Sequence, residues 1–355
     1  MKNSNLTLFQ IRGRPLGGER VNSKSEPLVS ILTPVYNGEA YLSECIESVL
    51  AQTYVNWDYT VVNNCSTDRT LEIAERYARM DERIRVHNNE AFLSIIENHN
   101  KAFRLISADS KYCKVVSADD WIYPEGISRL VEVAEANPSV GIVGSYQLSG
   151  SGPDWRRWRV KWVELPYPST VVPGREICRH HLLDGIYVFG TPTSLLYRSD
   201  LIQGKDSFYP NLTAEADTSA CYECLENTDF GFVHQVLSYE RVHEKAQSAE
   251  CRKLDTYRSS RLNDLIKYGS SCLTRDELES RLKELLNDYY RFLAASAFHF
   301  RDKEFWNYHK RRLEELGYHL ERIRLFKAVF MKLMDLLLNP KQSVEKTLKG
   351  SLSNL

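Results

Sequence analysis

Short apolar runs alternate with helical stripes through the first half of the chain. The strand-like runs lie at residues 28–33, 58–63, 83–88, 112–117 and 140–148. The stretches between them repeat apolar residues at i, i+3, i+4 and i+7, as in Leu42, Cys45, Ile46 and Val49, in Leu71–Ala78, around 91–106 and in Ile127–Ala134. Ser66, Thr67 and Asp68 are candidate N-caps for the second helix. Strand and helix in regular alternation predict a mainly parallel, doubly wound α/β sheet.

The pattern changes after residue 150. Residues 150–174 are rich in Gly, Pro, Trp and Arg, a composition typical of a long functional loop. Strand-like stretches at 191–199 and 230–243 then flank an acidic segment at 214–225, and the rest of the chain is charged and helical. We expect a flexible arm at 1–27, an α/β domain at 28–245 and a helical region at 246–355.

Composition excludes several classes of protein. The 355 residues are 43% hydrophobic and 26% charged, as in ordinary globular proteins. The net charge of −1 lacks the excess of basic residues that is typical of proteins that bind nucleic acid. No stretch of 18 apolar residues predicts a spanning helix, and the first 20 residues lack the apolar core of a signal peptide. Eight cysteines without small-scaffold spacing fit a reducing compartment, so we expect a cytoplasmic protein.

Polar clusters follow three of the predicted strands: TPVYNG after the first, NNCSTD after the second and SADDW after the fourth. In parallel sheets, ligands bind at the carboxyl ends of strands, so these clusters predict a site. The adjacent carboxylates of Asp119 and Asp120 suit Mg²⁺ or Mn²⁺. The alternative is that they cap a helix starting near Pro124. Neither a dinucleotide-binding nor a P-loop glycine motif occurs.

The order of these motifs resembles family 2 glycosyltransferases with the GT-A fold, over roughly residues 28–245. The resemblance rests on P-V-Y-N after the first strand, C-S-T-D-x-T after the second, and A-D-D-W followed by P-E. It implies inverting transfer of a sugar from a nucleotide-diphosphate donor, a UDP-sugar, to a hydroxyl of a glycan or lipid-linked glycan, as in bacterial polysaccharide biosynthesis.

The resemblance also assigns residues to the donor. Pro34 and Tyr36 would line the base pocket, and Asn63 would contact the base edge where the family has Asp; Asn63 and Asn64 replace an Asp pair. An amide carbonyl accepts from an imide N–H as a carboxylate does, but the amide also donates. A polar turn is the alternative for both Asn. The full set of predicted donor-binding residues is Thr33, Pro34, Tyr36, Asn37, Asn63, Asn64, Ser66, Asn100, Ser117, Ala118, Asp119, Asp120, Thr191, Thr193 and Arg241.

The family's Asp-x-Asp metal motif reads Ser117-Ala118-Asp119 in this chain. By the resemblance, Asp119 holds a divalent cation, Mn²⁺ or Mg²⁺, with the diphosphate, and Asp120 supports it. The missing carboxylate at Ser117 leads to the hypothesis of a weaker metal requirement. The segment SYERVHEKAQS resembles the end of the family's catalytic domain, which implies that His243 contacts the metal or the diphosphate and Arg241 the phosphates. A structural histidine is the alternative.

Inverting transfer needs a carboxylate that takes the acceptor's proton. The resemblance places it in Glu215-Ala216-Asp217, with Asp217 as the general base and Glu215 as the second candidate. The alternative is an acidic pair stabilised at a helix N-terminus.

Three further features leave alternatives open. Trp155, Trp158 and Trp162, interleaved with Arg156, Arg157 and Arg159, form either an acceptor-binding loop or ordinary packing with a solvated basic face. Cys221 and Cys224 are expected to be structural thiols rather than half a zinc site. The segment 321–346, which mixes Phe, Leu and Met with Arg and Lys, is a candidate for peripheral contact with an acidic membrane, with packing on the catalytic domain or a homodimer contact as alternatives.

Two other classes compete with a glycosyltransferase. A non-catalytic nucleotide-sugar-binding or scaffold protein would explain the carboxylates missing at Asn63, Asn64 and Ser117. A nucleotidyltransferase also uses acidic strand ends, but it needs a Gly-rich, basic loop after the first strand, which TPVYNGEAYL lacks.

Overall fold

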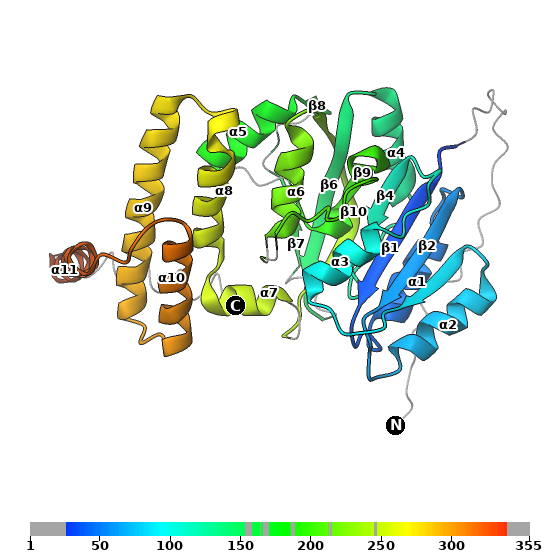
Figure 1. Cartoon of the computed structure of the whole chain (residues 1–355), viewed down its shortest axis with the longest axis horizontal. Helices are drawn as coiled ribbons and strands as arrows, with labels where there is room; N and C mark the ends of the chain where they lie inside the picture. Colours follow the sequence, from blue (N-terminus) through cyan, green and yellow to red (C-terminus); the bar gives the residue numbers. More distant parts are fainter. Residues whose placement is uncertain are drawn as a thin grey trace.

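The computed structural model describes residues 26–152, 158–163, 165, 170–185, 189–211, 213, 215–244 and 247–338. The predicted arm therefore lies outside the described residues, apart from Glu26 and Pro27. Within this part of the chain, a single large sheet is followed by a row of helices that extends away from it (Figure 1).

The sheet is built around strands that run in one direction. Its order is β3-β2-β1-β4-β9-β6-β10-β5. The strands β1, β2, β3 and β4 pair in parallel, and β10 pairs in parallel with β6. Their bounds are Val29–Val35 for β1, Trp57–Asn63 for β2, Ile84–Asn88 for β3, Tyr112–Val115 for β4, Val140–Gly150 for β6 and Asp229–Arg241 for β10. These six agree with the strands predicted from apolar runs to within a few residues.

The remaining strands make the sheet mixed, which the regular alternation did not predict. Only Leu195–Arg198 of the predicted strand 191–199 is extended; it forms β9, antiparallel to both β4 and β6. The preceding Pro192–Ser194 forms the 3-10 turn η2 because Pro192 fixes its own φ and lacks an N–H for the sheet. Three short strands, β5 (Trp121–Ile122), β7 (Arg159–Lys161) and β8 (Val171–Val172), also pair antiparallel.

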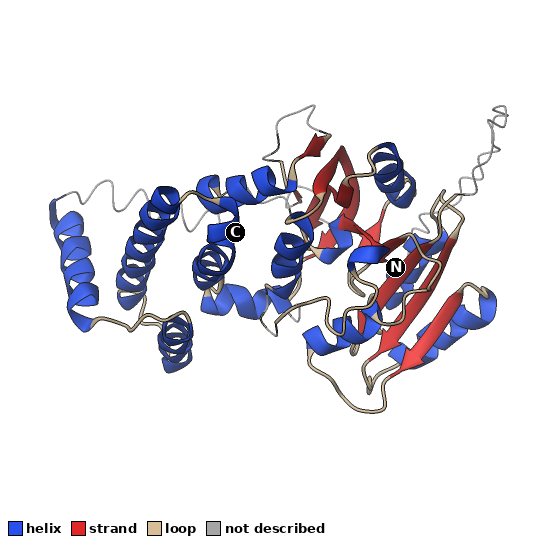
Figure 2. Cartoon of the chain, turned by 45° about the horizontal axis from the view of Figure 1, so that its top comes forward, coloured by secondary structure: helices blue, strands red, loops and turns tan. Residues whose placement is uncertain are grey.

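Helices cover both faces of the sheet (Figure 2). One hydrophobic core contains the apolar residues of α1, α2 and α4, and a second contains those of α3, α5 and α6. The bounds are Leu42–Leu50 for α1, Thr70–Met80 for α2, Ile95–Phe103 for α3, Gly126–Ala136 for α4, Gly174–Asp184 for α5 and Ala216–Leu225 for α6. The predicted stripe Leu42, Cys45, Ile46 and Val49 is completely buried. The two cores confirm the doubly wound arrangement.

Helix starts depend on local hydrogen bonds that the sequence shows only in part. Ser94 and Glu97 form a reciprocal capping box at α3. At α2 the predicted caps are wrong by one residue or more, because Arg69 is the N-cap. Asp68 still accepts from the backbone of Thr70, at 3.0 Å, so its carboxylate serves the first turn from just outside the helix.

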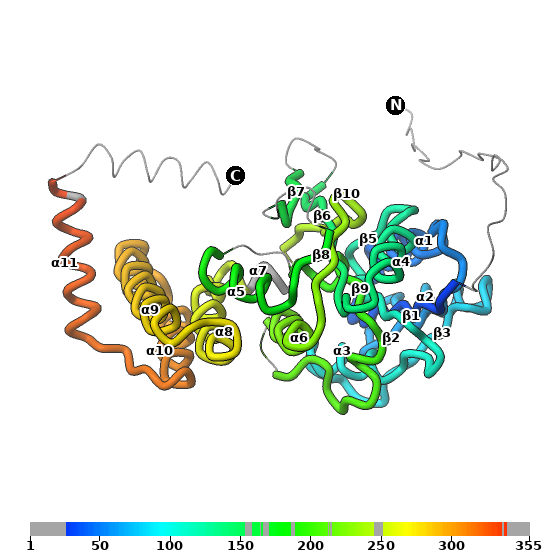
Figure 3. Tube along the Cα trace, turned by 90° about the horizontal axis from the view of Figure 1, so that it is seen from above, coloured from blue at the N-terminus to red at the C-terminus, as the bar shows by residue number. Residues whose placement is uncertain are grey.

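The helical region after residue 246 shares a hydrophobic core with the sheet and its covering helices. Leu265 and Tyr268 of α8 (Tyr257–Cys272) belong to the same core as α5 and α6, and Tyr222 stacks on Tyr268 with ring centroids 4.4 Å apart. The other helices are α7 (Gln247–Leu254), α9 (Arg275–Ala297), α10 (Lys303–Glu315) and α11 (Arg322–Leu338). Figure 3 shows α11 at the far end of this row, where it packs on α9 rather than on the sheet.

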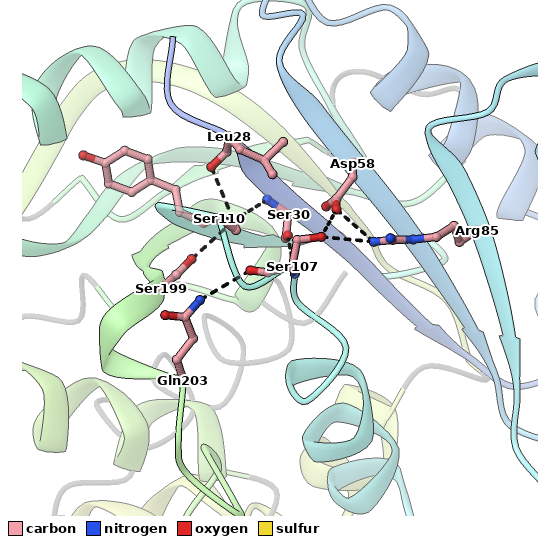
Figure 4. A network of polar contacts seen from close by, with 9 residues as sticks. Leu28, Ser30, Asp58, Arg85, Ser107, Ser110, Ser199 and Gln203 are labelled. Atoms are coloured by element: carbon pink, nitrogen blue, oxygen red, sulfur yellow. Dashed lines mark hydrogen bonds and ion pairs between the residues drawn. The ribbon is translucent and has the colours of Figure 1, made fainter. Parts of the chain in front are cut away.

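A polar network ties down the amino edge of the sheet (Figure 4). The backbone N–H of Ser30 donates to Ser110 Oγ at 3.0 Å, and Ser107 N donates to Ser30 Oγ at 3.1 Å. Arg85 and Asp58, on β3 and β2, pair at 2.8 Å, and Ser107 contacts both. These bonds hold the loop before β4 against β1 at the edge opposite to the strand-end clusters, so we assign the network to the fold.

Candidate active site

The loops after β1 and β2 are joined by reciprocal hydrogen bonds at the carboxyl edge of the sheet. Asn37 N donates to Ser66 Oγ at 2.9 Å, and Asn37 Oδ1 accepts from Thr67 N at 2.8 Å. Asn37 and Cys65 both have left-handed φ, at 51° and 56°, which turns the chain sharply at each strand end. The sequence placed Asn37 and Ser66 in a donor site; the structure brings them together, and their contact with a donor stays a prediction.

Gly38 continues this junction. Its N–H donates to Thr70 Oγ1 at 2.7 Å, and a Cβ added at Gly38 would lie 2.6 Å from Val35 Cγ2 and 3.7 Å from Ala118 Cβ. A side chain there would therefore clash with Val35 at the end of β1, while its distance to Ala118 is an ordinary van der Waals contact. Asp68 lies just before the N-cap of α2. Burial raises the pKa of Asp68, but hydrogen bonds from Thr70 and Glu39 lower it by more, so the pKa lies below its ordinary value.

The two asparagines after β2 have different surroundings. Asn64 Oδ1 accepts from Leu93 N at 2.9 Å and from Asn89 at 3.0 Å, while its amide donates to the Leu93 carbonyl. Asn63 donates to Asn88 and accepts from Ser66 N at 3.3 Å. Both side chains are buried. Asn64 thus holds the loop before α3 and keeps one amide N–H, whereas Asn63 keeps one N–H and one lone pair for another partner.

The DDW turn is organised from a distant segment. Thr193, in η2, donates to Asp120 Oδ2 at 2.6 Å and accepts from Ser117 N at 3.0 Å. The Thr193 and Ser117 hydroxyls lie 3.2 Å apart. Asp120 is buried, and burial together with the neighbouring Asp119 raises its pKa well above the ordinary value. Asp120 therefore fixes the turn, and Asp119 beside it is more exposed.

A buried lysine supports η2, the segment that carries Thr193. Lys114, on β4, is 1% exposed, and its Nζ donates to the carbonyls of Thr193 and Leu195, the latter at 2.8 Å. Burial lowers the pKa of Lys114 to about 7, opposed by the attraction of Asp120. Thr191 lies at the start of η2 and exchanges hydrogen bonds with Gln147, at 2.9 Å and 3.1 Å. The sequence did not single out Lys114, because one Lys in a strand carries no motif.

The end of β10 brings a histidine and an arginine to Asp119. His243 Nε2 lies 2.9 Å from Asp119 Oδ2, although 124 positions separate them. Arg241 Nε donates to the Asp119 carbonyl at 3.1 Å, and Arg241 N donates to Asp120 Oδ1 at 3.0 Å. The fold therefore brings together Asp119, Arg241 and His243, all of which were predicted from the sequence. Asp119 follows β4, and the other two lie at the end of β10, with β9 and β6 between these strands in the sheet.

The guanidinium of Arg241 is already engaged. It pairs with Glu44 at 2.5 Å and lies over the ring of Tyr41 at 4.3 Å and over Trp121 at 5.1 Å. Sequence reasoning missed Glu44 and Tyr41, because a pair 197 positions apart leaves no local signal. In this arrangement Arg241 positions the turn that carries Asp119, and its predicted contact with phosphates stays a prediction.

The metal-ligating atoms at this edge are few. Among the described residues, no group of three or more His, Cys, Asp and Glu side chains is placed to hold a metal ion. Asp119 Oδ2 and His243 Nε2 supply one oxygen and one nitrogen, which fits a divalent cation that takes its other ligands from a diphosphate and water. Ser117, where the family has Asp, adds no carboxylate.

The two candidate bases lie at the start of α6. Glu215 is the residue before the helix, and Asp217 is in its first turn, where Asp217 Oδ1 accepts from Thr218 N at 2.7 Å. Burial, reinforced by Glu215, raises the pKa of Asp217 to about 6. Asp264 of α8, which is 3% exposed, has a pKa raised to about 7 by burial, with Glu215 and Asp217 adding to it. Asp217 thus holds its proton more tightly than an ordinary Asp.

Several predicted residues are buried and form hydrogen bonds within the fold. Thr33 is fully buried and bridges the strands, with contacts to Tyr59 at 2.8 Å and to the Val116 carbonyl at 2.7 Å. Both amide atoms of Asn100 bind the backbone of Tyr209, at 2.8 Å and 3.1 Å. Together with Asn64, these side chains form the bonds that hold the strands and loops beneath the site, and their predicted contact with a donor stays a prediction.

An exposed aromatic pair stands next to this edge. Tyr36, which is 49% exposed, contacts Phe92 edge to face with centroids 4.9 Å apart, and Phe92 is 61% exposed. The sequence predicted Tyr36 but not Phe92, which lies between β3 and α3 without a motif. Pro34 is buried below them and Ala118 is half-buried. The exposed face of either ring can stack on a base.

The other predicted features lie outside the described residues, at the border of this cluster or within the fold. Trp155, Arg156 and Arg157 lie outside them, and Trp162 donates to Gln147 at 3.4 Å. All eight cysteines are free thiols, and Cys221 and Cys224 are buried in α6, as expected for structural residues. A recess of about 380 Å³ lined by Gly174, Arg198 and Thr228 lies at the amino ends of β6 and β10, opposite to the site.

Comparison with known proteins agrees with this architecture. Residues 30–203 match the family model described as Glycosyl transferase family 2. Relatives include an uncharacterized glycosyltransferase of Haemophilus influenzae, 37% identical over 120 residues, which are 34% of this chain and 36% of that protein. Another is the uncharacterized glycosyltransferase EpsJ of Bacillus subtilis, 41% identical over 119 residues, 33% of each chain. The match thus spans about a third of these relatives' length.

A solved structure resembles a larger part of the chain. The crystal structure of S. aureus TarS 1–349 in complex with UDP-GlcNAc superposes with a TM-score of 0.59 over 84% of this chain and 86% of that one, at 18% sequence identity. Together with the family match, this likeness shows the GT-A fold.

Proposed function

Since the chain belongs to glycosyl transferase family 2, we propose that it transfers a sugar, a hexosyl or N-acetylhexosaminyl group, from a UDP-sugar to a hydroxyl of a glycan or lipid-linked glycan. The observation that carries the proposal is the contact of His243 with Asp119, 2.9 Å apart at the carboxyl edge of the sheet. Two segments far apart in the chain meet where such folds bind ligands. A putative teichuronic acid biosynthesis glycosyltransferase of B. subtilis, TuaG, 38% identical over 95 residues, supports a role in polysaccharide biosynthesis.

Asp217 is the proposed general base. It would take the proton of the acceptor hydroxyl onto a carboxylate oxygen while that hydroxyl's oxygen bonds to the sugar's anomeric carbon. The bond from this carbon to the diphosphate breaks on the opposite face, which inverts the configuration. A pKa of about 6 keeps Asp217 largely ionised at neutral pH and makes it a stronger proton acceptor than an ordinary Asp. Glu215 is the second candidate.

Asp119 and His243 are the proposed ligands of a divalent cation, Mn²⁺ or Mg²⁺. Such an ion would offset the negative charge on the departing diphosphate. The chain's own residues prepare this place: Asp120, bound to Thr193 and to the backbone of Arg241, holds the turn so that the Asp119 carboxylate faces His243.

The donor's base would lie on Tyr36 and Phe92, with Asn63 at its edge. The remaining N–H and lone pair of the Asn63 amide match the carbonyl and the imide N–H of a uracil. We propose that residues 28–245 form the transferase unit, that the protein works in the cytoplasm, and that the helices after 246 brace this unit through α8.

Transfer and hydrolysis assays test the proposal. The chain is incubated with UDP-sugars, and release of UDP is measured with and without acceptor and Mn²⁺. We expect turnover that Asp217→Asn reduces by about 10²–10⁴-fold while donor binding is kept. Turnover unchanged in both Asp217→Asn and Glu215→Gln would remove the assigned base.

One observation favours a second function, that of a nucleotide-sugar-binding protein without turnover. Asn63, Asn64 and Ser117 stand where the family has carboxylates. In that case UDP-sugar would raise the melting temperature by linkage. No UDP would be released with any acceptor tested, and Asp217→Asn would bind the donor as the wild type does.

A further inference from the structure

The last described helix, α11, has two apolar faces. One face packs on α9: Leu325 is partly buried against the core that α7, α8, α9 and α10 share, and Arg324 donates to Asn287 at 2.8 Å and lies 4.5 Å over the ring of Tyr290. The other face is open. Its apolar residues follow at helical spacing and form what we call the outer stripe: Ile323, Phe326, Phe330, Leu333 and Leu337.

The outer stripe is unusually exposed for its residue types. Ile323 is 86% exposed, Phe326 72% and Leu337 66%. A contiguous row of large apolar side chains in water costs free energy unless something covers it. The helix α11, which carries the outer stripe, lies at the end of the molecule farthest from the sheet (Figure 1), so the catalytic unit does not cover the stripe.

The charge of α11 and of the residues after it indicates which kind of partner covers the outer stripe. α11 carries four basic residues, Arg322, Arg324, Lys327 and Lys332, against one acidic residue, Asp335. The following residues 339–355 add Lys341, Lys346 and Lys349 against Glu345. This end of the chain is therefore strongly basic although the whole protein has a net charge of −1. Arg322 and Lys327 adjoin the outer stripe and form no ion pair with the described residues.

A second copy of the chain would bring two such basic helices face to face. An anionic lipid surface offers the opposite charge and an apolar layer at the same time, which is the pairing that interfacial amphipathic helices use. Among the described residues, none of the helices is long and apolar enough to cross a membrane. We propose that α11 lies in the surface of a membrane containing anionic lipids, with the outer stripe inserted among the acyl chains.

The proposal is tested by flotation of the full-length protein with phosphatidylglycerol vesicles and with phosphatidylcholine vesicles. We expect binding to the first and little to the second. Phe326→Ser combined with Phe330→Ser should lower the partition coefficient at least tenfold, because two aromatic side chains no longer leave water. Arg322→Gln combined with Lys327→Gln should lower it roughly 25-fold on the anionic vesicles, at about fivefold for each charge.

The matched control removes two exposed apolar side chains elsewhere. Val55 and Met80, 65% and 71% exposed, lie on the sheet side of the molecule, and Val55→Ser with Met80→Ser should bind as the wild type does. Circular dichroism and melting curves show whether each variant folds; Leu337→Gln serves if the Phe pair does not.

Two results would overturn the proposal. The first is vesicle binding that is absent, or is equal in the Phe variant and the control. The second is a dimer in sedimentation velocity that the Phe variant breaks while vesicles bind nothing, which would assign the outer stripe to a second copy. The assay contains no sugar donor, so its outcome is independent of the proposed transfer.

Discussion

Thr193 donates its hydroxyl hydrogen to Asp120 Oδ2 across 2.6 Å and at the same time accepts from the backbone of Ser117 at 3.0 Å. One buried hydroxyl thus closes the loop that carries the DDW sequence. Asp120 is nearly inaccessible to solvent, so without this donor a carboxyl group would lose one of its partners in a place that water does not reach.

Thr193→Val tests this relationship, because it keeps the shape and removes the hydroxyl. We expect the free energy of unfolding to fall by about 1–3 kcal/mol, as for other buried groups that lose their partner, and transfer to fall with it. Urea denaturation and initial rates measure the two effects. Thr193→Ser, which retains the hydroxyl, is the control and should keep most of the activity. A loss in Thr193→Ser without a loss in Thr193→Val would point to packing by the methyl group instead.

Asp217→Asn should separate stability from catalysis. Burial raises the pKa of Asp217 from 3.8 to about 6, so the folded state favours the protonated acid. The stabilisation by Asp217 is complete below pH 3.8 and is lost as pH rises through about 6. At neutral pH the neutral amide should therefore stabilise the protein, on the order of 1 kcal/mol after allowing for partial exposure.

The wild-type rate with saturating donor should fall as pH decreases through about 6, because the proton acceptor is lost. pH–rate profiles and melting curves at several pH values check both effects. An acid limb that remains unchanged in residual turnover of Asp217→Asn would assign it to another group.

Ser117→Asp should strengthen metal dependence. It restores the carboxylate that the family carries two positions before Asp119, and a hard cation binds more tightly as anionic oxygens are added. We expect the Mn²⁺ concentration for half-maximal activity to fall severalfold, and chelator to inhibit the variant more fully than the wild type. Ser117→Ala is the control, expected to resemble the wild type. A loss of activity at all Mn²⁺ concentrations would mean that the added charge instead repels Asp119 and the diphosphate.

Phe92→Ala should weaken donor binding. Stacking of a base on an aromatic side chain contributes about 1–3 kcal/mol, so the dissociation constant for UDP should rise by roughly 5- to 150-fold in Tyr36→Ala and by a smaller factor within that range in Phe92→Ala. Calorimetric titration with UDP measures this. Phe300→Ala, which removes a ring that is 94% exposed in the turn before α10, is the control. Binding of UDP at wild-type strength to Phe92→Ala would confine the base to Tyr36.

The sequence predicted the strands of this fold better than it predicted which residues meet at the candidate site. The six main strands follow from apolar runs, since each run is buried by helices on both faces. The 191–199 stretch was wrong in its first half because Pro192 starts a turn there, and that turn proved to organise Asp120. Asp119 and His243 were found through family motifs. Lys114, Glu44 and Phe92 were missed, because their significance lies in partners that are distant in the chain.

The stacking of Tyr222 on Tyr268 has a consequence for how the protein can be divided. Tyr222 lies on α6, whose first turn carries Asp217, and Tyr268 lies on α8, beyond the end of the family match. A chain shortened at residue 245 would expose the back of α6 to water and remove the helix that holds it. Such a fragment should retain the sheet and the Asp119 turn yet lose the fixed position of its base, so the transferase unit at 28–245 needs the support of α8 to be active.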